Sequence, residues 1–245
     1  MPRYTLPRKT WQRIVFVLSI AALIVVRLNK SVPGQGSRQD SRPPRNGSET
    51  RGSSRQSTPP PSTGKWQTME GCLLVEDKGN DGDSFVLRHG DSEYTFRLYF
   101  VDCPEKYRHQ WNGDRLAEQG RYFGGLSEEE TIAVGEAARD FSLGLLRKGP
   151  VTVFTRWEPV YDSERRYAFV TADSRDLAEA LVSRGLARIH TKGAKRPGGT
   201  SEREEQSRLH ALERTAKNQR LGAWGAVNSA PPEVVPSRPS SPGRK

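Results

Sequence analysis

The sequence predicts an α+β fold in which five short strands close into a barrel and about three helices pack on it. One observation is a series of short β-like runs separated by turns rich in Gly, Asp and Asn. Another is a set of longer segments with helical periodicity and recognisable start and stop signals. A third is that only residues 65–227 contain enough apolar side chains to form a core.

Three predicted strands precede the first helix and two follow it. The first three are Gly71–Val75, Ser84–Arg88 and Tyr94–Val101, and "RHGDSE" is the hairpin turn between the second and third. The last two are Val151–Thr155 and Tyr167–Thr171. Five strands with a helix after the third match a small closed Greek-key barrel of the OB type.

Three helices are predicted around this barrel. The first begins at a capping box, Ser127 and Glu130, and ends at Gly149-Pro150. Its predicted apolar face consists of Ile132, Ala137, Phe141 and Leu145. The second helix spans Leu177–Arg184. The third runs from about Glu202 to Arg220, with Leu209, Leu212 and Ala216 on one face.

The two ends of the chain differ from this region. Residues 1–30 contain basic residues followed by the apolar run Ile14–Val26, which predicts a signal peptide or, because no clear A-x-A cleavage site follows, an uncleaved signal anchor. A buried core helix is the alternative. Residues 31–64 and 228–245, rich in Ser and Pro, are predicted to be a disordered linker and tail. We therefore expect an exported protein, either membrane-anchored and facing outward or secreted or periplasmic after cleavage.

Charge and cysteine content narrow the functional classes. The net charge is +10 and the pI is near 9.8, so the surface should attract polyanions such as nucleic acid or acidic lipid headgroups. Two cysteines exclude a disulfide scaffold and a Cys-rich zinc module. The four histidines show no zinc-binding spacing.

Four acidic residues nevertheless cluster in this basic chain, at Asp81, Asp83, Asp102 and Glu105, close to Arg97. Neighbouring carboxylates repel one another unless a cation or hydrogen-bond donors offset their charge. The cluster therefore indicates either a solvated, loop-rich surface or a metal site. Oxygen ligands without imidazole are what calcium prefers.

Five motifs carry a resemblance to a known family: "DGDS", "TFRLYFVDCPE", "RRYAFV", "LAEALVSRGLARI" and "LGAW". Their order and spacing resemble the staphylococcal nuclease (thermonuclease) family, an OB-fold group of calcium-dependent phosphodiesterases. The resemblance covers about Cys72 to Trp224. The first two motifs together are the specific ones, and the other three are supporting context.

The resemblance implies a calcium site. Asp83 and Asp102 correspond to direct ligands, and the backbone carbonyl of Cys103 corresponds to a further ligand. Asp81 would lie in the outer shell. Manganese and magnesium also accept oxygen ligands, so the residue types alone do not select calcium.

The resemblance also assigns the groups that act on the substrate. Glu105 corresponds to the carboxylate next to the attacking water, as general base or water-orienting group. Arg97 and Arg165 correspond to the guanidinium groups that hold the scissile phosphate. The turn "YDSERRYAF" leaves Arg166 as an alternative to Arg165, since a slip of one residue would exchange them.

Together these features predict a calcium-dependent endonuclease that hydrolyses DNA, with RNA as a second candidate substrate. The resemblance implies that cleavage leaves 3'-phosphate ends. A basic surface would make activity fall with salt. One alternative is a non-catalytic OB module that binds nucleic acid or protein. Another is a surface anchor whose basic linker binds acidic lipid or wall polymer.

Two departures from the family leave alternatives open. Tyrosines that pack near the nucleotide in the staphylococcal enzyme are replaced by His190, Thr191 and Lys192, which puts base preference in doubt. The aromatic residues of the Lys106–Leu126 insertion could replace them, but we expect them to pack instead; they are Tyr107, Trp111, Tyr122 and Phe123. Cys72 and Cys103 could form a disulfide in an oxidising compartment or remain two half-buried thiols.

Overall fold

The computed structural model describes residues 56–226. The predicted signal or anchor, most of the predicted linker and all of the predicted tail lie outside this range. Within residues 56–226, no helix is both long enough and apolar enough to span a membrane. The apolar run Ile14–Val26 is not among these residues.

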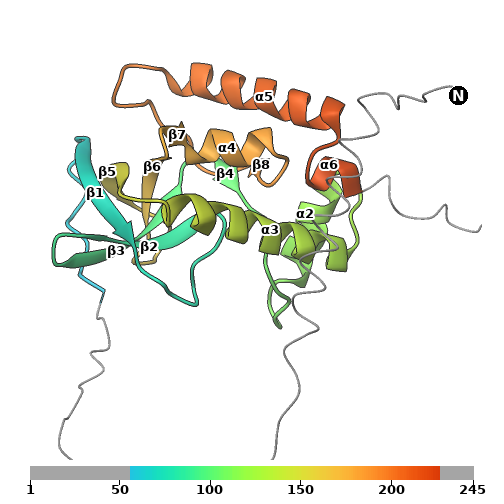
Figure 1. The fold of residues 1–245 in the computed structure, drawn as a ribbon, viewed down its shortest axis with the longest axis horizontal. Helices are drawn as coiled ribbons and strands as arrows, with labels where there is room; N and C mark the ends of the chain where they lie inside the picture. Colours follow the sequence, from blue (N-terminus) through green and yellow to red (C-terminus); the bar gives the residue numbers. More distant parts are fainter. Residues whose placement is uncertain (1–55, 227–245) are drawn as a thin grey trace, which may run out of the picture. The chain divides into compact units, whose positions relative to one another are not determined.

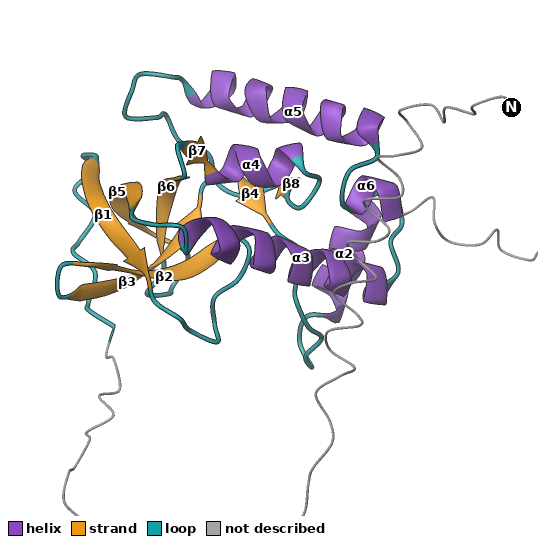
Figure 2. Cartoon of the chain, viewed as in Figure 1, coloured by secondary structure: helices purple, strands orange, loops and turns teal. Residues whose placement is uncertain are grey.

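Five strands form the predicted closed barrel (Figure 2). Neighbours follow the order β3-β2-β1-β5-β6, and a parallel pairing of β3 with β6, with Leu98 opposite Ala168, closes the sheet. The strands are β1 (Gln67–Leu74), β2 (Ser84–His89), β3 (Ser92–Leu98), β5 (Val151–Pro159) and β6 (Arg166–Ala172). The α+β barrel of OB type is therefore confirmed.

Three short strands extend this framework. They are β4 (Val101–Asp102), β7 (Arg175–Asp176) and β8 (Arg188–Ile189), each of two residues. β7 pairs with the end of β6, whereas β4 and β8 form a separate antiparallel pair outside the barrel. The β4–β8 pair places Asp102 opposite Arg188.

The three predicted helices are present as α3 (Glu128–Leu146), α4 (Leu177–Ser183) and α5 (Glu202–Gln219). α4 packs against both α3 and α5 (Figure 1). Two further helices were not predicted, α2 (Gly113–Tyr122) and the short α6 (Ala223–Ala226). α2 has weak sequence signals, because it contains two glycines and its N-cap residue, Asn112, makes no side-chain capping bond. Packing of Leu116 and Gln119 stabilises it instead.

The capping box of α3 is confirmed, but its predicted apolar face is wrong at most positions. Of Ile132, Ala137, Phe141 and Leu145, only Leu145 is buried, and Ala137 is exposed. The buried face runs through Val134 and Ala138 and includes the polar residues Thr131 and Ser142. Each of these two hydroxyls donates to a main-chain carbonyl, which offsets the cost of burying it.

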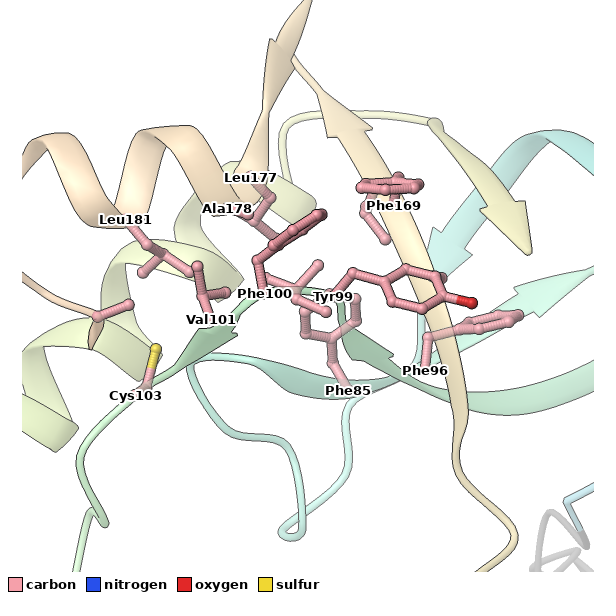
Figure 3. Packing of buried hydrophobic residues seen from close by; sticks show 14 of the residues in the cluster. Phe85, Phe96, Tyr99, Phe100, Val101, Cys103, Phe169, Leu177, Ala178 and Leu181 are labelled. Carbon is pink, nitrogen blue, oxygen red and sulfur yellow. The ribbon is translucent and has the colours of Figure 1, made fainter. Parts of the chain in front are cut away.

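Aromatic residues fill the interior of the barrel (Figure 3). The rings of Tyr99 and Phe169 lie 5.0 Å apart between centroids, and Phe96 and Phe85 are fully buried near them. Leu177 of α4 covers this cluster from the helical side. Aromatic side chains bury large apolar areas, so this cluster holds the strands that carry the polar site described below.

Part of the predicted linker contacts the barrel. Thr95 Oγ1 donates to Gln56 Oε1 at 2.9 Å. The backbone nitrogen of Ser57 donates to the Glu93 carbonyl at 2.8 Å. Residues 56–64, placed in the linker by composition, thus include segments bound to β3.

Gly135 lets α3 approach the chain that follows β4. A Cβ atom at Gly135 would lie 2.4 Å from the Glu105 carbonyl oxygen and 2.5 Å from that of Pro104. By contrast, a Cβ atom at Gly144 of the same helix would meet nothing within 4 Å. This contact fixes the backbone that carries Glu105.

We expect Gly135→Ala to lower the free energy of unfolding by about 1–3 kcal/mol, because main-chain atoms rather than flexible side chains must move. Gly144→Ala is the matched control and should raise it by up to about 1 kcal/mol, since alanine favours a helix interior. Urea denaturation of both variants measures the difference. If both substitutions raised the free energy of unfolding equally, α3 would not approach the chain closely at Gly135.

Candidate functional site

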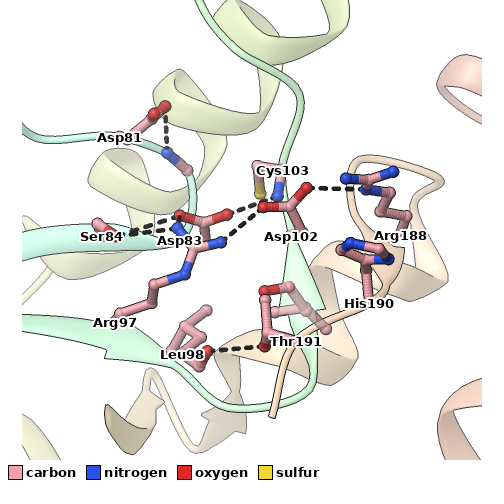
Figure 4. Close-up of polar contacts among 12 residues, drawn as sticks. Asp81, Asp83, Ser84, Arg97, Leu98, Asp102, Cys103, Arg188, His190 and Thr191 are labelled. Carbon is pink, nitrogen blue, oxygen red and sulfur yellow. Dashed lines mark hydrogen bonds and ion pairs between the residues drawn. The ribbon is translucent and has the colours of Figure 1, made fainter. Parts of the chain in front are cut away.

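A sharp bend between β3 and β4 brings Arg97 and Asp102 together. Phe100 lies in this bend with φ +67°, a conformation that is costly for a bulky residue. Its backbone nitrogen donates to the Lys192 carbonyl at 2.9 Å, which helps to hold it there. As a result, Arg97 Nη2 lies 2.6 Å from Asp102 Oδ1 (Figure 4).

Asp83 completes a buried cluster on the other side of Arg97. Arg97 Nη1 lies 2.6 Å from Asp83 Oδ1, and the backbone nitrogen of Cys103 donates to Asp83 Oδ2 at 2.6 Å. Burial raises the pKa of Asp83, and the charge of Arg97 opposes this shift only in part. Three of the predicted site residues, Asp83, Asp102 and Cys103, thus lie around Arg97.

Asp102 accepts four hydrogen bonds. Oδ1 accepts from Arg97 and from Arg115 Nη2, each at 2.6 Å. Oδ2 accepts from Arg188 Nε at 2.8 Å and from Gln119 Nε2 at 3.0 Å. Burial raises the pKa of Asp102, but the charges of Arg115 and Arg97 outweigh it, so that this pKa lies below its ordinary value.

Two donors to this cluster come from α2 and were missed in the sequence. Arg115 Nε lies 2.8 Å from Glu105 Oε1, so one guanidinium contacts both Asp102 and Glu105. Gln119 donates from Nε2 to the Cys103 carbonyl at 3.0 Å and accepts at Oε1 from the Glu105 backbone nitrogen at 3.1 Å. The i, i+4 spacing of Arg115 and Gln119 places them on one helix face. This shared face can be read from the sequence only if a helix is predicted there.

Asp81 lies beside the cluster rather than within it. Its Oδ1 accepts from the backbone nitrogen of Gly82 at 2.8 Å. Burial, with the charge of Asp83, raises the pKa of Asp81 to about 7, and the charge of Glu105 adds to the shift. The charge of Lys106 and the hydrogen bond from Gly82 oppose this rise in pKa only in part.

A cleft of about 690 Å³ opens beside the cluster. Among the residues that line it are Arg97, Asp102, Arg115, Tyr161, Arg165, Tyr167, Arg188, His190, Thr191 and Lys192. His190 and Thr191 lie next to Arg188 and the β3–β4 bend (Figure 4). Side chains from β3, α2, β6 and β8, far apart in sequence, therefore meet in one basic cavity.

Arg165 lines this cleft and Arg166 does not. Arg166 Nη1 instead donates to the carbonyls of Ser163 and Arg165, at 2.9 and 3.0 Å. Within residues 56–226, no carboxylate pairs with the Arg165 guanidinium. Burial lowers the pKa of Arg165, and the positive charge of Arg97 lowers it further.

The aromatic residues of the insertion divide into two pairs. Tyr122 and Phe123 pack against Trp224, with ring centroids 6.0 and 4.8 Å away, as predicted. Trp111 and Tyr107 are 82% and 55% exposed, so the packing prediction is wrong for them. They precede α2 in a segment held by polar contacts rather than by a core. Neither lines the cleft.

The two cysteines are free, buried thiols in the structure. The alternative of a Cys72–Cys103 disulfide is therefore not found. Burial raises the pKa of both thiols. A protonated thiol is a poor ligand for a hard cation.

The candidate metal ligands predicted from the sequence are oxygen donors only. Among the described residues, no group of three or more His, Cys, Asp or Glu side chains is arranged to hold one. The predicted set uses two carboxylates, Asp83 and Asp102, and one main-chain carbonyl, that of Cys103. The two carboxylates contact Arg97, and the carbonyl accepts from Gln119. Oxygen donors of this kind suit a hard cation that completes its coordination with water, so the donor type fits.

A family model matches this chain, in agreement with its order of elements, its barrel and its polar cluster. The model described as "Staphylococcal nuclease homologue" matches residues 95–226, more than half of the chain. The chain belongs to this family. A staphylococcal nuclease domain indicates nuclease-like or nucleic-acid-binding function. Asp81 and Asp83 precede the matched range, whereas Arg97, Asp102 and Arg165 lie within it.

A relative of known name supports the same family. The chain is 31% identical over 149 residues to "Staphylococcal nuclease domain-containing protein 1" of Schizosaccharomyces pombe. The match covers 59% of this chain and only 14% of that relative. The shared part is therefore a small portion of a much longer protein.

Proposed function

We propose that this chain is a calcium-dependent phosphodiesterase that cleaves DNA, with RNA as a second candidate substrate. The observation that carries the proposal is the Arg165 guanidinium, which shares a cleft with Arg97 and has no carboxylate partner among the described residues. A half-buried cation without an anion favours an anionic ligand. The ligand that matches two neighbouring guanidinium groups is a phosphate.

The lining of the cleft suits a nucleic-acid backbone. Lys192 also lines it and carries a positive charge, which Glu158 partly offsets. Phosphate contacts from Arg and Lys position a nucleic acid without reading its sequence. Exposed Tyr161, on the same cleft, offers a face on which an unstacked base could pack.

The proposed reaction is hydrolysis of a phosphodiester by water. Asp83, Asp102 and the Cys103 carbonyl would hold the calcium ion, which supplies charge neutralisation at the phosphate. Glu105 accepts a proton from the water that attacks phosphorus. Arg97 and Arg165 hold the non-bridging oxygens as their charge develops. The bond from phosphorus to the 5' oxygen breaks and this oxygen takes up a proton from water, which leaves a 3'-phosphate and a 5'-hydroxyl.

Arg97 has donors left for this role. A guanidinium has five N–H groups. Asp83, Ser84 and Asp102 accept three hydrogen bonds from Arg97. Because two carboxylates fix the position of Arg97, its remaining donors are oriented before the substrate binds.

We further propose that the chain acts outside the cytoplasm, tethered or exported by residues 1–30. This rests on the basic residues that precede the apolar run Ile14–Val26. The linker that follows would let the catalytic domain reach substrate away from a membrane.

A non-catalytic nucleic-acid-binding module is the second candidate. The observation that favours it is that Asp102 and the Cys103 carbonyl already accept hydrogen bonds from protein donors. A site saturated in this way need not bind metal. The two candidates differ in whether a bond is cut.

Cleavage of heat-denatured DNA by the purified full chain distinguishes them. We expect cleavage with calcium and its loss with excess chelator, and products that carry 3'-phosphates when end-labelled. Magnesium and manganese are assayed in parallel, because both accept oxygen ligands. Binding of the DNA without cleavage, in the presence of any of these ions, would favour the non-catalytic module.

A further inference from the structure

Arg115 occupies a position that the proposed reaction does not explain. Its guanidinium lies 2.6 Å from Asp102, a proposed calcium ligand, and 2.8 Å from Glu105, the proposed base. One side chain of α2 therefore neutralises both carboxylates on which the proposed function depends.

Asp102 must lose at least one hydrogen bond before it can bind a metal, because its two oxygens already accept four. Burial identifies which donor can leave. The side chains of Arg97 and Arg188 are 9% and 3% exposed, and each also pairs with a second acidic residue. Gln119 is fully buried and holds the Cys103 carbonyl as well.

Arg115 differs from these three donors, since its side chain is 44% exposed and lines the cleft. It can leave Asp102 without being drawn out of a core. If it does, Glu105 loses its only side-chain partner among the described residues at the same time. The group that would take Arg115 is an anion in the cleft, which already contains Arg97 and Arg165.

We propose that Arg115 competes with calcium for the metal site. In the metal-free protein Arg115 binds Asp102 and Glu105. When a cation binds Asp102, Arg115 moves to the substrate phosphate. This inference rests on the proposed function. Its consequence is that Arg115 lowers calcium affinity in the absence of substrate. Substrate phosphate then raises that affinity, because it draws Arg115 away, and the two ligands bind cooperatively.

Calcium titration by calorimetry tests the competition directly, with the purified full chain at low ionic strength. We expect Arg115→Gln to bind calcium at least about fivefold more tightly than wild type. Arg121→Gln is the matched control, because Arg121 lines the same cleft on the same helix but its side chain forms no hydrogen bond or ion pair among the described residues. It removes the same charge and should leave calcium affinity nearly unchanged.

A second titration includes thymidine 3'-phosphate, which has no phosphodiester bond to cleave. The nucleotide should tighten calcium binding in wild type and in Arg121→Gln, and tighten it much less in Arg115→Gln. A merely structural Arg115 would not alter this coupling.

The outcomes separate the inference from the proposed function. If wild type binds calcium and Arg115→Gln binds it equally or more weakly, the inference is wrong and the proposed function stands. If Arg115→Gln and Arg121→Gln bind calcium equally more tightly than wild type, the cause is a general charge effect, and the inference is again wrong. If neither wild type nor variants bind calcium, both the inference and the calcium dependence are wrong.

Discussion

Replacing Arg165 by Gln is expected to lower kcat/KM for denatured DNA by about 10²–10³-fold, the usual cost of removing one group that stabilises transition-state charge. Arg165 lines the cleft and has no carboxylate partner among residues 56–226, so its positive charge is available to a phosphate. A neutral amide of similar length keeps some hydrogen bonding but supplies neither the charge nor the planar fork. The measurement is initial rate against DNA concentration in calcium.

Arg166→Gln is the control for this result. Arg166 precedes Tyr167 in β6 and donates to main-chain carbonyls instead of lining the cleft. Its replacement should change kcat/KM by less than about threefold, while the free energy of unfolding falls by the roughly 1 kcal/mol typical of a lost hydrogen bond. The opposite ranking of the two variants would assign the phosphate contact to Arg166, the alternative that the turn sequence left open.

Replacing Glu105 by Gln should lower kcat by about 10²–10⁴-fold, the range that general base catalysis contributes, with a small change in KM. The amide cannot accept a proton from water, but it has nearly the same shape. The backbone of Glu105 is held by Gln119 and by the close approach of Gly135, so the substitution should not displace the loop. Single-turnover rates in calcium give the size of the effect.

Asp114→Asn provides the matched control for Glu105→Gln. Asp114 lies on the rim of the same cleft, is exposed and changes charge in the same way. Its kcat should stay within about threefold of wild type, because the field of an exposed charge is screened by solvent and salt. Unchanged activity in Glu105→Gln would remove this carboxylate from the reaction and require another base.

The barrel and the main helices could be predicted because their signals are local. Strand runs bounded by turns, and the capping box of Ser127 and Glu130, act over a few residues, and the structure contains both. The contiguous segment "TFRLYFVDCPE" likewise placed Arg97, Asp102 and Glu105 within nine residues of one another. A bend of the chain was enough to bring the first two into contact.

Features that depend on distant contacts were predicted less well. The face of α3 was placed incorrectly because buried Thr131 and Ser142 look like surface residues until their main-chain acceptors are known. Trp111 looks like a core residue by type, yet it is 82% exposed, because residue type alone does not say which apolar side chains find a core to pack into.

By itself the sequence determined the fold class, the family resemblance and the identities of the acidic and basic residues in the candidate site. Only the tertiary structure decided how those charges are paired. Arg188 lies 86 residues from Asp102 along the chain, and the β4–β8 pairing sets them opposite each other. Arg115 reaches Asp102 and Glu105 because packing, rather than intrinsic propensity, forms α2. Charge pairing depends on distances of a few ångströms between separate elements, and local sequence patterns contain no such distances.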